Sequence, residues 1–529
     1  MYERKQEPRL TSIGSLAVVL TLAVALSQLW HASALAADNS KNMYVEAVEA
    51  HWKWNLDEAI RLYTRVLALD PDHARAYFNR GVAYRSKGDI DRALEDFSRA
   101  LDRDPKIVDA LYGRGLIYLE KKRNDKAIED MNKVIALDAE HAGAYRARAE
   151  ANIGQGDHQA AIQDLNSALA LYPQDSQAYY LRAVAHFDAK ESDKALADLD
   201  KALELNPKYG DAWLKRGNLL FSRGNVAGAI QNYDKAINLD VKNVEAFNNR
   251  GWAHAEAGNL DGAIKDLSRA LELDPKFGLA RLNRAAIYRK MDRNEEAVED
   301  YTELIRLHRS DTAIRLARGE VLMDLKRPEQ AIEDFNQALQ KSPSDPTILG
   351  LRGRAEVMAG RYREAIADLD AALRSNANDA KALYARGLAY VEQGAFPAAI
   401  RDFKAAIAAD ADFSSADIYY QMGRAYLLNR DLDNAITAFT TVIKKQPSHG
   451  LAYANRGVAY KDKQLYSRAA EDFRQALTLL KQESRVAQVS RLLNEALSLS
   501  KKASTFTFPS PFSAGPDEMG SEPEPRRFW

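Results

Sequence analysis

An alanine recurs every 34 residues through most of this chain, and no other feature limits the possible fold as strongly. Steps of 34 residues from Ala59 meet an alanine each time as far as Ala399, and the series resumes two residues out of phase after an insertion near Ser414. Thirteen repeats follow one another over residues 40–483. A fixed period of this size indicates stacked supersecondary units, because one such unit cannot bury its apolar face alone.

Each repeat carries the signals of two helices. Twelve residues before the alanine comes Gly or Ala, and four residues after it comes a bulky apolar residue such as Phe97 or Tyr233. Small residues at a fixed offset let two helices cross closely, and the apolar spacing fits one helical stripe. Seven repeats then end in proline, which stops a helix. Each repeat is therefore predicted to be a helix, a tight turn and a second helix.

This pattern resembles the tetratricopeptide repeat family, which places an aromatic residue, Gly or Ala, Tyr, Ala, a large apolar residue, Ala and Pro over 34 residues. The resemblance covers residues 40–483. It implies an all-α fold, an α-solenoid in which helix-turn-helix repeats form a right-handed superhelix and the first helix of each pair lines a concave groove. Polar residues replace the family's tyrosine at Asn152, His186, His254 and Glu356, and we expect looser packing there.

An arginine precedes the small Gly or Ala in eleven repeats, and an acid or amide follows that arginine sixteen residues later. Arg80 with Asp96 and Arg250 with Asp266 are two examples. The two repeats that lack the arginine also lack the acid. We therefore predict structural ion pairs between the two helices of a repeat. The alternative is an arginine ladder that binds anions or sugars, which the pairing disfavours because each guanidinium already has a partner.

The resemblance also implies which residues face the groove, namely the fifth and twelfth of each repeat. Aromatic residues at these places, joined by one from the ninth, are the predicted binding candidates: Phe78, Tyr112, Tyr180, Phe187, Phe221, Trp252, Tyr384 and Tyr420. Such rings anchor peptides or stack on sugars. Ordinary packing between neighbouring first helices is the alternative.

A second pattern is an acidic track at the thirteenth position of alternate repeats. Its members are Glu120, Asp188, Glu256, Asp324, Glu392 and Asp462. An acid near the end of a helix meets the negative end of the helix dipole, so stability does not require these residues. They form either a track that favours a basic partner or a solvated surface.

Both ends of the chain lie outside the repeats. Residues 1–36 have a basic start, an apolar run over 13–29 and an Ala-x-Ala sequence ending at Ala36, which together predict a cleaved bacterial signal peptide. We expect a periplasmic or secreted protein; the alternative is an uncleaved anchor in the inner membrane, facing the periplasm. Residues 484–502 are predicted to form a capping helix, and residues 503–529 a disordered Pro/Ser-rich tail.

Composition narrows the function. The 74 Lys and Arg nearly balance the 75 Asp and Glu, so we expect no nucleic-acid partner, and contact with a membrane only through an uncleaved N-terminal segment. No cysteine, no metal-ligand spacing of histidines and no catalytic motif is present in the sequence, so we expect no metal, no cofactor and no enzymatic activity. The prediction is a non-enzymatic scaffold or adaptor that binds a protein or peptide partner in the groove. The alternative is a carbohydrate-handling scaffold in polysaccharide secretion or envelope assembly.

Overall fold

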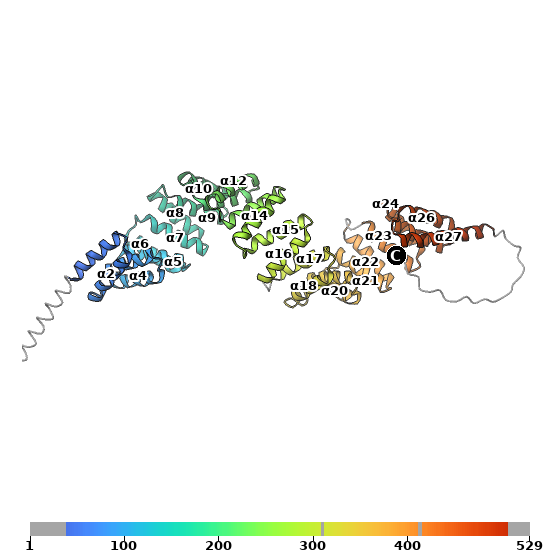
Figure 1. Ribbon diagram of the computed structural model, residues 1–529, viewed down its shortest axis with the longest axis horizontal. Coiled ribbons are helices and arrows are strands. Elements are labelled where there is room, and N and C mark those ends of the chain that lie inside the picture. Colours follow the sequence, from blue (N-terminus) through green and yellow to red (C-terminus); the bar gives the residue numbers. More distant parts are fainter. Residues whose placement is uncertain (1–38, 308–310, 411–414, 506–529) are drawn as a thin grey trace, which may run out of the picture. The chain divides into compact units, whose positions relative to one another are not determined.

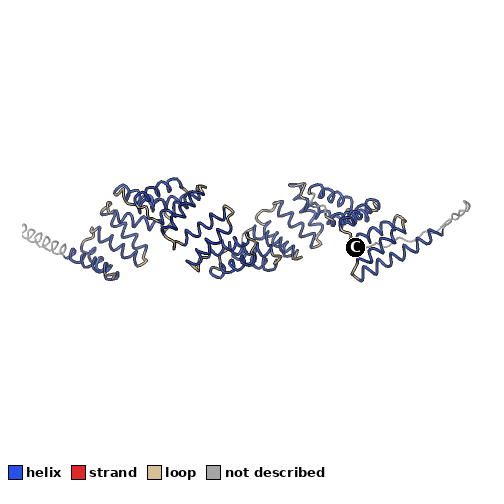
Figure 2. The backbone as a smooth tube through the Cα atoms, turned by 90° about the horizontal axis from the view of Figure 1, so that it is seen from above, coloured by secondary structure: helices blue, strands red, loops and turns tan. Residues whose placement is uncertain are grey.

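The computed structural model describes residues 39–307, 311–410 and 415–505. The proposed signal peptide and the tail from residue 506 onward lie outside the described residues. Every regular element in the described ranges is an α-helix, and short turns connect the helices (Figures 1 and 2). The chain divides into an N-terminal body, Met1–Gly262, and a C-terminal body, Ala263–Trp529.

The N-terminal body begins with a helix over residues 39–52. It continues with α2 (Leu56–Leu69), α3 (Ala74–Ser86), α4 (Ile90–Arg103), α5 (Val108–Glu120), α6 (Asn124–Leu137), α7 (Ala142–Gln155), α8 (His158–Leu171), α9 (Ser176–Asp188), α10 (Ser192–Leu205), α11 (Gly210–Ser222), α12 (Val226–Leu239) and α13 (Val244–Glu256).

The division between the bodies falls within α14 (Leu260–Leu273). The C-terminal body contains α15 (Gly278–Lys290), α16 (Asn294–Leu307), α17 (Thr312–Asp324), α18 (Pro328–Leu339), α19 (Pro346–Met358), α20 (Tyr362–Ser375), α21 (Ala380–Glu392), α22 (Phe396–Ala409), α23 (Ala416–Leu428), α24 (Leu432–Lys445), α25 (Gly450–Asp462), α26 (Tyr466–Leu479) and α27 (Glu483–Thr505).

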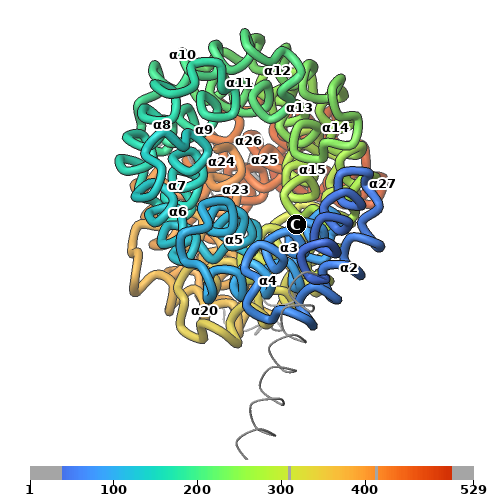
Figure 3. The backbone as a smooth tube through the Cα atoms, turned by 90° about the vertical axis from the view of Figure 1, so that its left-hand side faces the viewer, coloured from blue at the N-terminus to red at the C-terminus, as the bar shows by residue number. Residues whose placement is uncertain are grey.

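Helix pairs are the building unit of both bodies. Each odd-numbered helix from α3 to α25 is the first helix of a repeat. Within each body this first helix packs against the even-numbered helix that follows, as α3 does against α4 and α25 against α26. Within each body the second helix then packs against the first helix of the next repeat, as α4 does against α5. In the N-terminal body, Figure 3 shows α9, α11 and α13 on the inner side of the curve and α8, α10 and α12 on the outer side. This stacking confirms the predicted all-α solenoid.

The small residue of the first helix lets an aromatic ring of the second helix lie against its backbone. A Cβ atom added to Gly81 would lie 2.8 Å from the Phe97 ring, and one added to Gly217 would lie 2.5 Å from the Tyr233 ring. Gly319, Gly387, Gly423 and Gly457 face phenylalanine rings in the same way. Contacts this close exclude a side chain, so these glycines set how closely the two helices approach.

A residue with a left-handed backbone conformation forms each turn inside a helix pair. Glycine supplies it in six turns, and seven other turns use a residue with a side chain: Trp54, Lys122, Lys190, Asp292, Lys326, Arg430 and Gln464. Glycine adopts this conformation without steric cost, whereas other residues are strained there. The turn geometry is therefore the same along the chain although its sequence is not.

The last helix, α27, packs against α26 and covers the end of the array. Val489 and Ala496 of α27 are fully buried and join the core that contains Phe473 and Ala476. None of the helices in the described ranges combines the length and apolarity needed to cross a membrane.

A cleft on the first helices

In nine repeats, an arginine of the first helix holds the two helices of that repeat together by a double contact. Arg80 donates from Nε to Asp96 Oδ2 at 2.7 Å and from Nη2 to Oδ1 at 2.8 Å. Such a two-point contact is the strongest geometry available to this pair. The same double contact joins Arg114–Asp130, Arg148–Asp164, Arg182–Asp198, Arg284–Asp300, Arg318–Asp334, Arg352–Asp368, Arg386–Asp402 and Arg456–Asp472.

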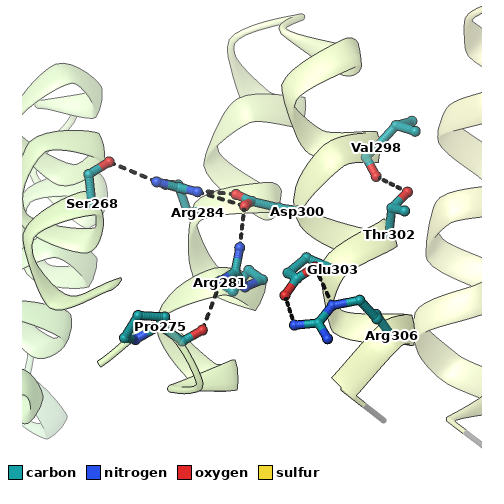
Figure 4. A network of polar contacts seen from close by, with 9 residues as sticks. All are labelled: Ser268, Pro275, Arg281, Arg284, Val298, Asp300, Thr302, Glu303 and Arg306. Carbon is teal, nitrogen blue, oxygen red and sulfur yellow. Dashed lines mark hydrogen bonds and ion pairs between the residues drawn. The ribbon is translucent and has the colours of Figure 1, made fainter. Parts of the chain in front are cut away.

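A third contact of the same arginine reaches the preceding repeat. Arg80 Nη1 donates to Thr64 Oγ1 at 3.0 Å, and Arg284 Nη1 donates to Ser268 Oγ at 2.9 Å (Figure 4). The acceptors in the other repeats are Ser98, Asn132, Asn166, Asp200, Asp234, Thr302, Asn336, Asp370 and Thr440. Each of these arginines therefore joins its own repeat to the repeat before it.

Sequence reasoning missed this third contact, although a signal was present. The position sixteen residues before each of these arginines holds Ser, Thr, Asn or Asp. The repeat at Met422 has no such arginine, and the equivalent place in the repeat before it holds Lys404, which cannot accept a hydrogen bond. Acceptor and arginine are thus present together and absent together.

The two predicted partners Arg250 and Asp266 belong to different bodies, so their pairing stays a prediction. Within the N-terminal body, Arg250 Nη1 donates to Asp234 Oδ1 at 2.7 Å. Asp266 is buried, with 5% of its surface exposed. Arg216 uses its atoms differently from the other arginines, because Nε binds Asp200 at 2.7 Å and Nη1 binds Asn232 at 3.1 Å.

Most of the aromatic candidates pack against their own chain. The Tyr112 and Tyr420 rings lie 4.6 Å and 4.8 Å from His141 and His449, the histidines that cap the next first helices. Tyr180 lies 4.9 Å from Tyr209. These rings therefore join successive repeats.

The remaining aromatic candidates differ in their surroundings. Phe78 and Tyr384 each lie 5.8 Å from a core phenylalanine, Phe97 or Phe403. The Tyr384 hydroxyl also donates to Asp417. Phe187 packs on the core beside α10. Phe221 and Trp252 are half-buried.

The six acids of the predicted track are not equivalent. Asp462 accepts a hydrogen bond from Arg430 Nη1 at 2.9 Å, and Glu392 lies 3.6 Å from Arg424 Nη2. Glu120, Asp188 and Glu256 are exposed. Asp324 lines the cleft described next.

A cleft of about 610 Å³ crosses four consecutive first helices of the C-terminal body. Binding clefts for small groups and short segments commonly have volumes of about 300–1,000 Å³. Its lining comes from α15, α17, α19, α21 and the turn after α17: Arg289, Glu320, Met323, Asp324, Lys326, Arg354, Val357, Met358, Lys381, Tyr384, Ala385 and Leu388. Two of the sequence-predicted residues, Tyr384 and Asp324, meet here. The first helices of this body thus carry a hollow that spans several repeats.

The cleft is basic as well as apolar. Its four cationic side chains outnumber Glu320 and Asp324, the two anionic ones. Within the described ranges, the side chains of Lys326, Arg354 and Lys381 form neither hydrogen bonds nor ion pairs. Sequence reasoning missed these cations because arginine and lysine occur on many of the first helices. By residue type alone, Arg354 does not differ from the arginines that pair with an acid sixteen residues later. The described ranges hold no group of three or more side chains suited to bind a metal ion.

Comparisons with known proteins agree with this architecture. Models described as tetratricopeptide repeat or TPR repeat match residues 55–106, 83–142, 115–186, 176–209, 217–258, 244–277, 282–346, 351–412 and 420–484. No curated protein matches the chain.

Solved structures of low identity also match. One is the Cut9 and Hcn1 hetero-tetramer of APC/C, at 15% identity and a TM-score of 0.40, covering 87% of this chain and 96% of that one. A repeat protein from Parabacteroides merdae matches at 21% identity and a TM-score of 0.38, covering 48% of this chain and 98% of the other. Yeast Tom70 matches at 15% identity and a TM-score of 0.32, covering 88% and 99%.

Proposed function

Because this chain belongs to the tetratricopeptide repeat family, whose members serve as protein-interaction scaffolds, we propose that it is a non-enzymatic scaffold that binds a protein or peptide partner on its first helices. The cleft across α15, α17, α19 and α21 is the observation that carries the proposal. An extended segment laid across several repeats would contact one side chain from each. Consecutive first helices therefore supply regularly spaced contacts without any catalytic group.

The alternative of a carbohydrate-handling scaffold has less support. Sugar binding needs aromatic faces that are open to a ring. Tyr112, Tyr180 and Tyr420 already stack on residues of the next repeat. Phe187, Phe221 and Trp252 are the candidates that contact no other aromatic ring in the described residues. Loss of glycan binding on Trp252→Ala would therefore support this alternative.

We place this scaffold outside the cytosol. The proposal rests on the basic start, apolar run and Ala-x-Ala sequence of residues 1–36. Sequencing the N-terminus of the protein from its source cells tests it. A mature chain that starts at Ala37 supports export with cleavage, whereas an intact Met1 on a membrane-bound protein supports the anchored alternative.

Affinity capture from the cell envelope tests the binding proposal. Leu388→Glu places a charge on the apolar lining, and we expect it to release the partner that the native protein retains. Arg363→Glu, an exposed residue of the second helix α20, is the matched control and should retain the partner. Equal capture by all three proteins would show that the cleft is not the binding surface.

A further inference from the structure

Two arginines of α19 stand two residues apart and have opposite surroundings. Arg352 donates to Asp368 at 2.6 Å and 2.9 Å and to Asn336 at 2.8 Å, so each of its three side-chain nitrogen atoms donates a hydrogen bond. Arg354 is half-buried, lines the cleft and forms no hydrogen bond or ion pair with the described residues. A partly desolvated guanidinium without an anion is a cost to the folded protein. Stability explains Arg352 and does not explain Arg354.

Further cations surround Arg354 in the same cleft. Lys381 comes from α21, Lys326 from the turn after α17, and Arg289 from α15. Lys326 and Lys381 are exposed and have no partner among the described residues. Positive side chains that converge on one hollow raise the local concentration of an anionic ligand. Both acids of the lining, Glu320 and Asp324, lie on α17 alone.

The apolar part of the lining limits what the anion can be. Met323, Val357 and Leu388 lie among the cations, and Met358 leaves 45% of its surface exposed. Methionine side chains adapt to irregular apolar partners. Phosphate or a nucleic-acid backbone offers no apolar group to cover this surface. A protein segment in which acidic and aliphatic residues alternate offers both kinds of contact.

We propose that the cleft binds an acidic segment of a partner protein, with carboxylates on Arg354, Lys381 and Lys326 and an aliphatic side chain on Met323, Val357 and Leu388. The inference rests on the proposed scaffold function and specifies the chemistry of its partner. The acidic track suggested a basic partner, whereas this cleft favours an acidic one, because its four cationic side chains outnumber Asp324 and Glu320. Salt should weaken the complex, since the cationic side chains are partly open to solvent.

Selection of random 12-residue peptides on the purified protein tests the chemistry. We expect the enriched peptides to carry several Asp or Glu and at least one Leu, Ile or Val. Fluorescence anisotropy of an enriched peptide should show about tenfold or more weaker binding by Arg354→Glu, because a repelling charge replaces an attracting one. Arg363→Glu reverses one charge on the outer helix of the same pair and should leave the affinity unchanged. A melting curve equal to that of the native protein shows that Arg354→Glu is folded.

Other outcomes separate the two proposals. Enriched peptides that are neutral or basic, and that Leu388→Glu releases, would overturn the acidic partner and leave the scaffold function intact. Polyglutamate that binds as tightly as the enriched peptides would overturn the role of the apolar lining. If no peptide depends on Leu388 or Arg354, both the acidic partner and the cleft as a binding surface are contradicted.

Discussion

At the residue scale, this molecule repeats one arrangement, an arginine fixed at three points, and departs from it at a few places. Arg80, with Asp96 in its own repeat and Thr64 in the preceding one, shows the full arrangement. Asp96 has 3% of its surface exposed. Removing one member therefore leaves a buried group without its partner, which is more harmful than removing both.

Arg80→Ala is expected to lower the free energy of unfolding by about 3–5 kcal/mol, because it leaves the buried Asp96 carboxylate without its cationic partner. Asp96→Ala should have a similar effect, because it leaves the Arg80 guanidinium without its anionic partner. The double variant should lose clearly less than the sum of the two single losses. Urea denaturation of all four proteins measures this cycle, and additive losses would refute a coupled pair.

Glu356 is a departure from the pattern, at a place where six other repeats have a tyrosine. It is 6% exposed, its Oε2 atom has no hydrogen-bond partner, and Oε1 lies 3.8 Å from Arg352 Nε. Burial, with Asp368 nearby, raises the pKa of Glu356 to about 7, against the opposing charge of Arg352. The folded protein thus holds a proton that the unfolded chain releases near pH 4.5.

The sign of the pH dependence follows from that raised pKa. The contribution of Glu356 to stability is complete below pH 4.5 and is lost as the pH rises through 7. Glu356→Gln should therefore match the native protein near pH 4 and exceed it at pH 8, by at most about 3 kcal/mol. Urea denaturation of both proteins at the two values measures the difference. A difference that does not change with pH would contradict the buried, protonated carboxyl.

At the scale of the element, the sequence predicted the helix pairs well, and the reasons are physical. Steric contact at Gly81 against Phe97 and at Gly217 against Tyr233 admits only small residues, so the period shows in the sequence. The cleft was harder to predict, because the side chains of Arg354 and Lys381 have no partner among the described residues that a paired pattern could reveal. The position of each turn was predicted, but its left-handed residue was not, since seven turns use residues other than glycine.

Lys122 tests the turn geometry. It is exposed and has a φ of 54°, where a side chain is strained. Lys122→Gly is expected to raise the free energy of unfolding by about 1 kcal/mol, while Lys122→Ala, which keeps the strain, should have little effect. Thermal melting compares the two variants. Equal stability of both would show that the backbone conformation at this turn carries no cost.

At the scale of the whole molecule, each repeat within a body contacts the repeats next to it along the chain. The third arginine contact likewise joins a repeat to the one before it, as Arg80 does with Thr64 and Arg284 with Ser268. Stability in such arrays is close to a sum of repeat and neighbour terms. The surfaces that neighbours do not cover are therefore free to evolve for a partner. Within the C-terminal body, the cleft across α15, α17, α19 and α21 is such a surface.

Paired substitutions in α19 test the central claim most directly, namely that one set of residues holds the repeats together while another binds the partner. Arg352→Ala and Arg354→Ala each remove one arginine from the same helix, and melting temperature and partner binding are measured for both. We predict that Arg352→Ala lowers the melting temperature and still binds while folded, whereas Arg354→Ala melts like the native protein and loses binding. If Arg354→Ala destabilises the fold as much as Arg352→Ala does, or binds as well as the native protein, the separation of the two roles is contradicted.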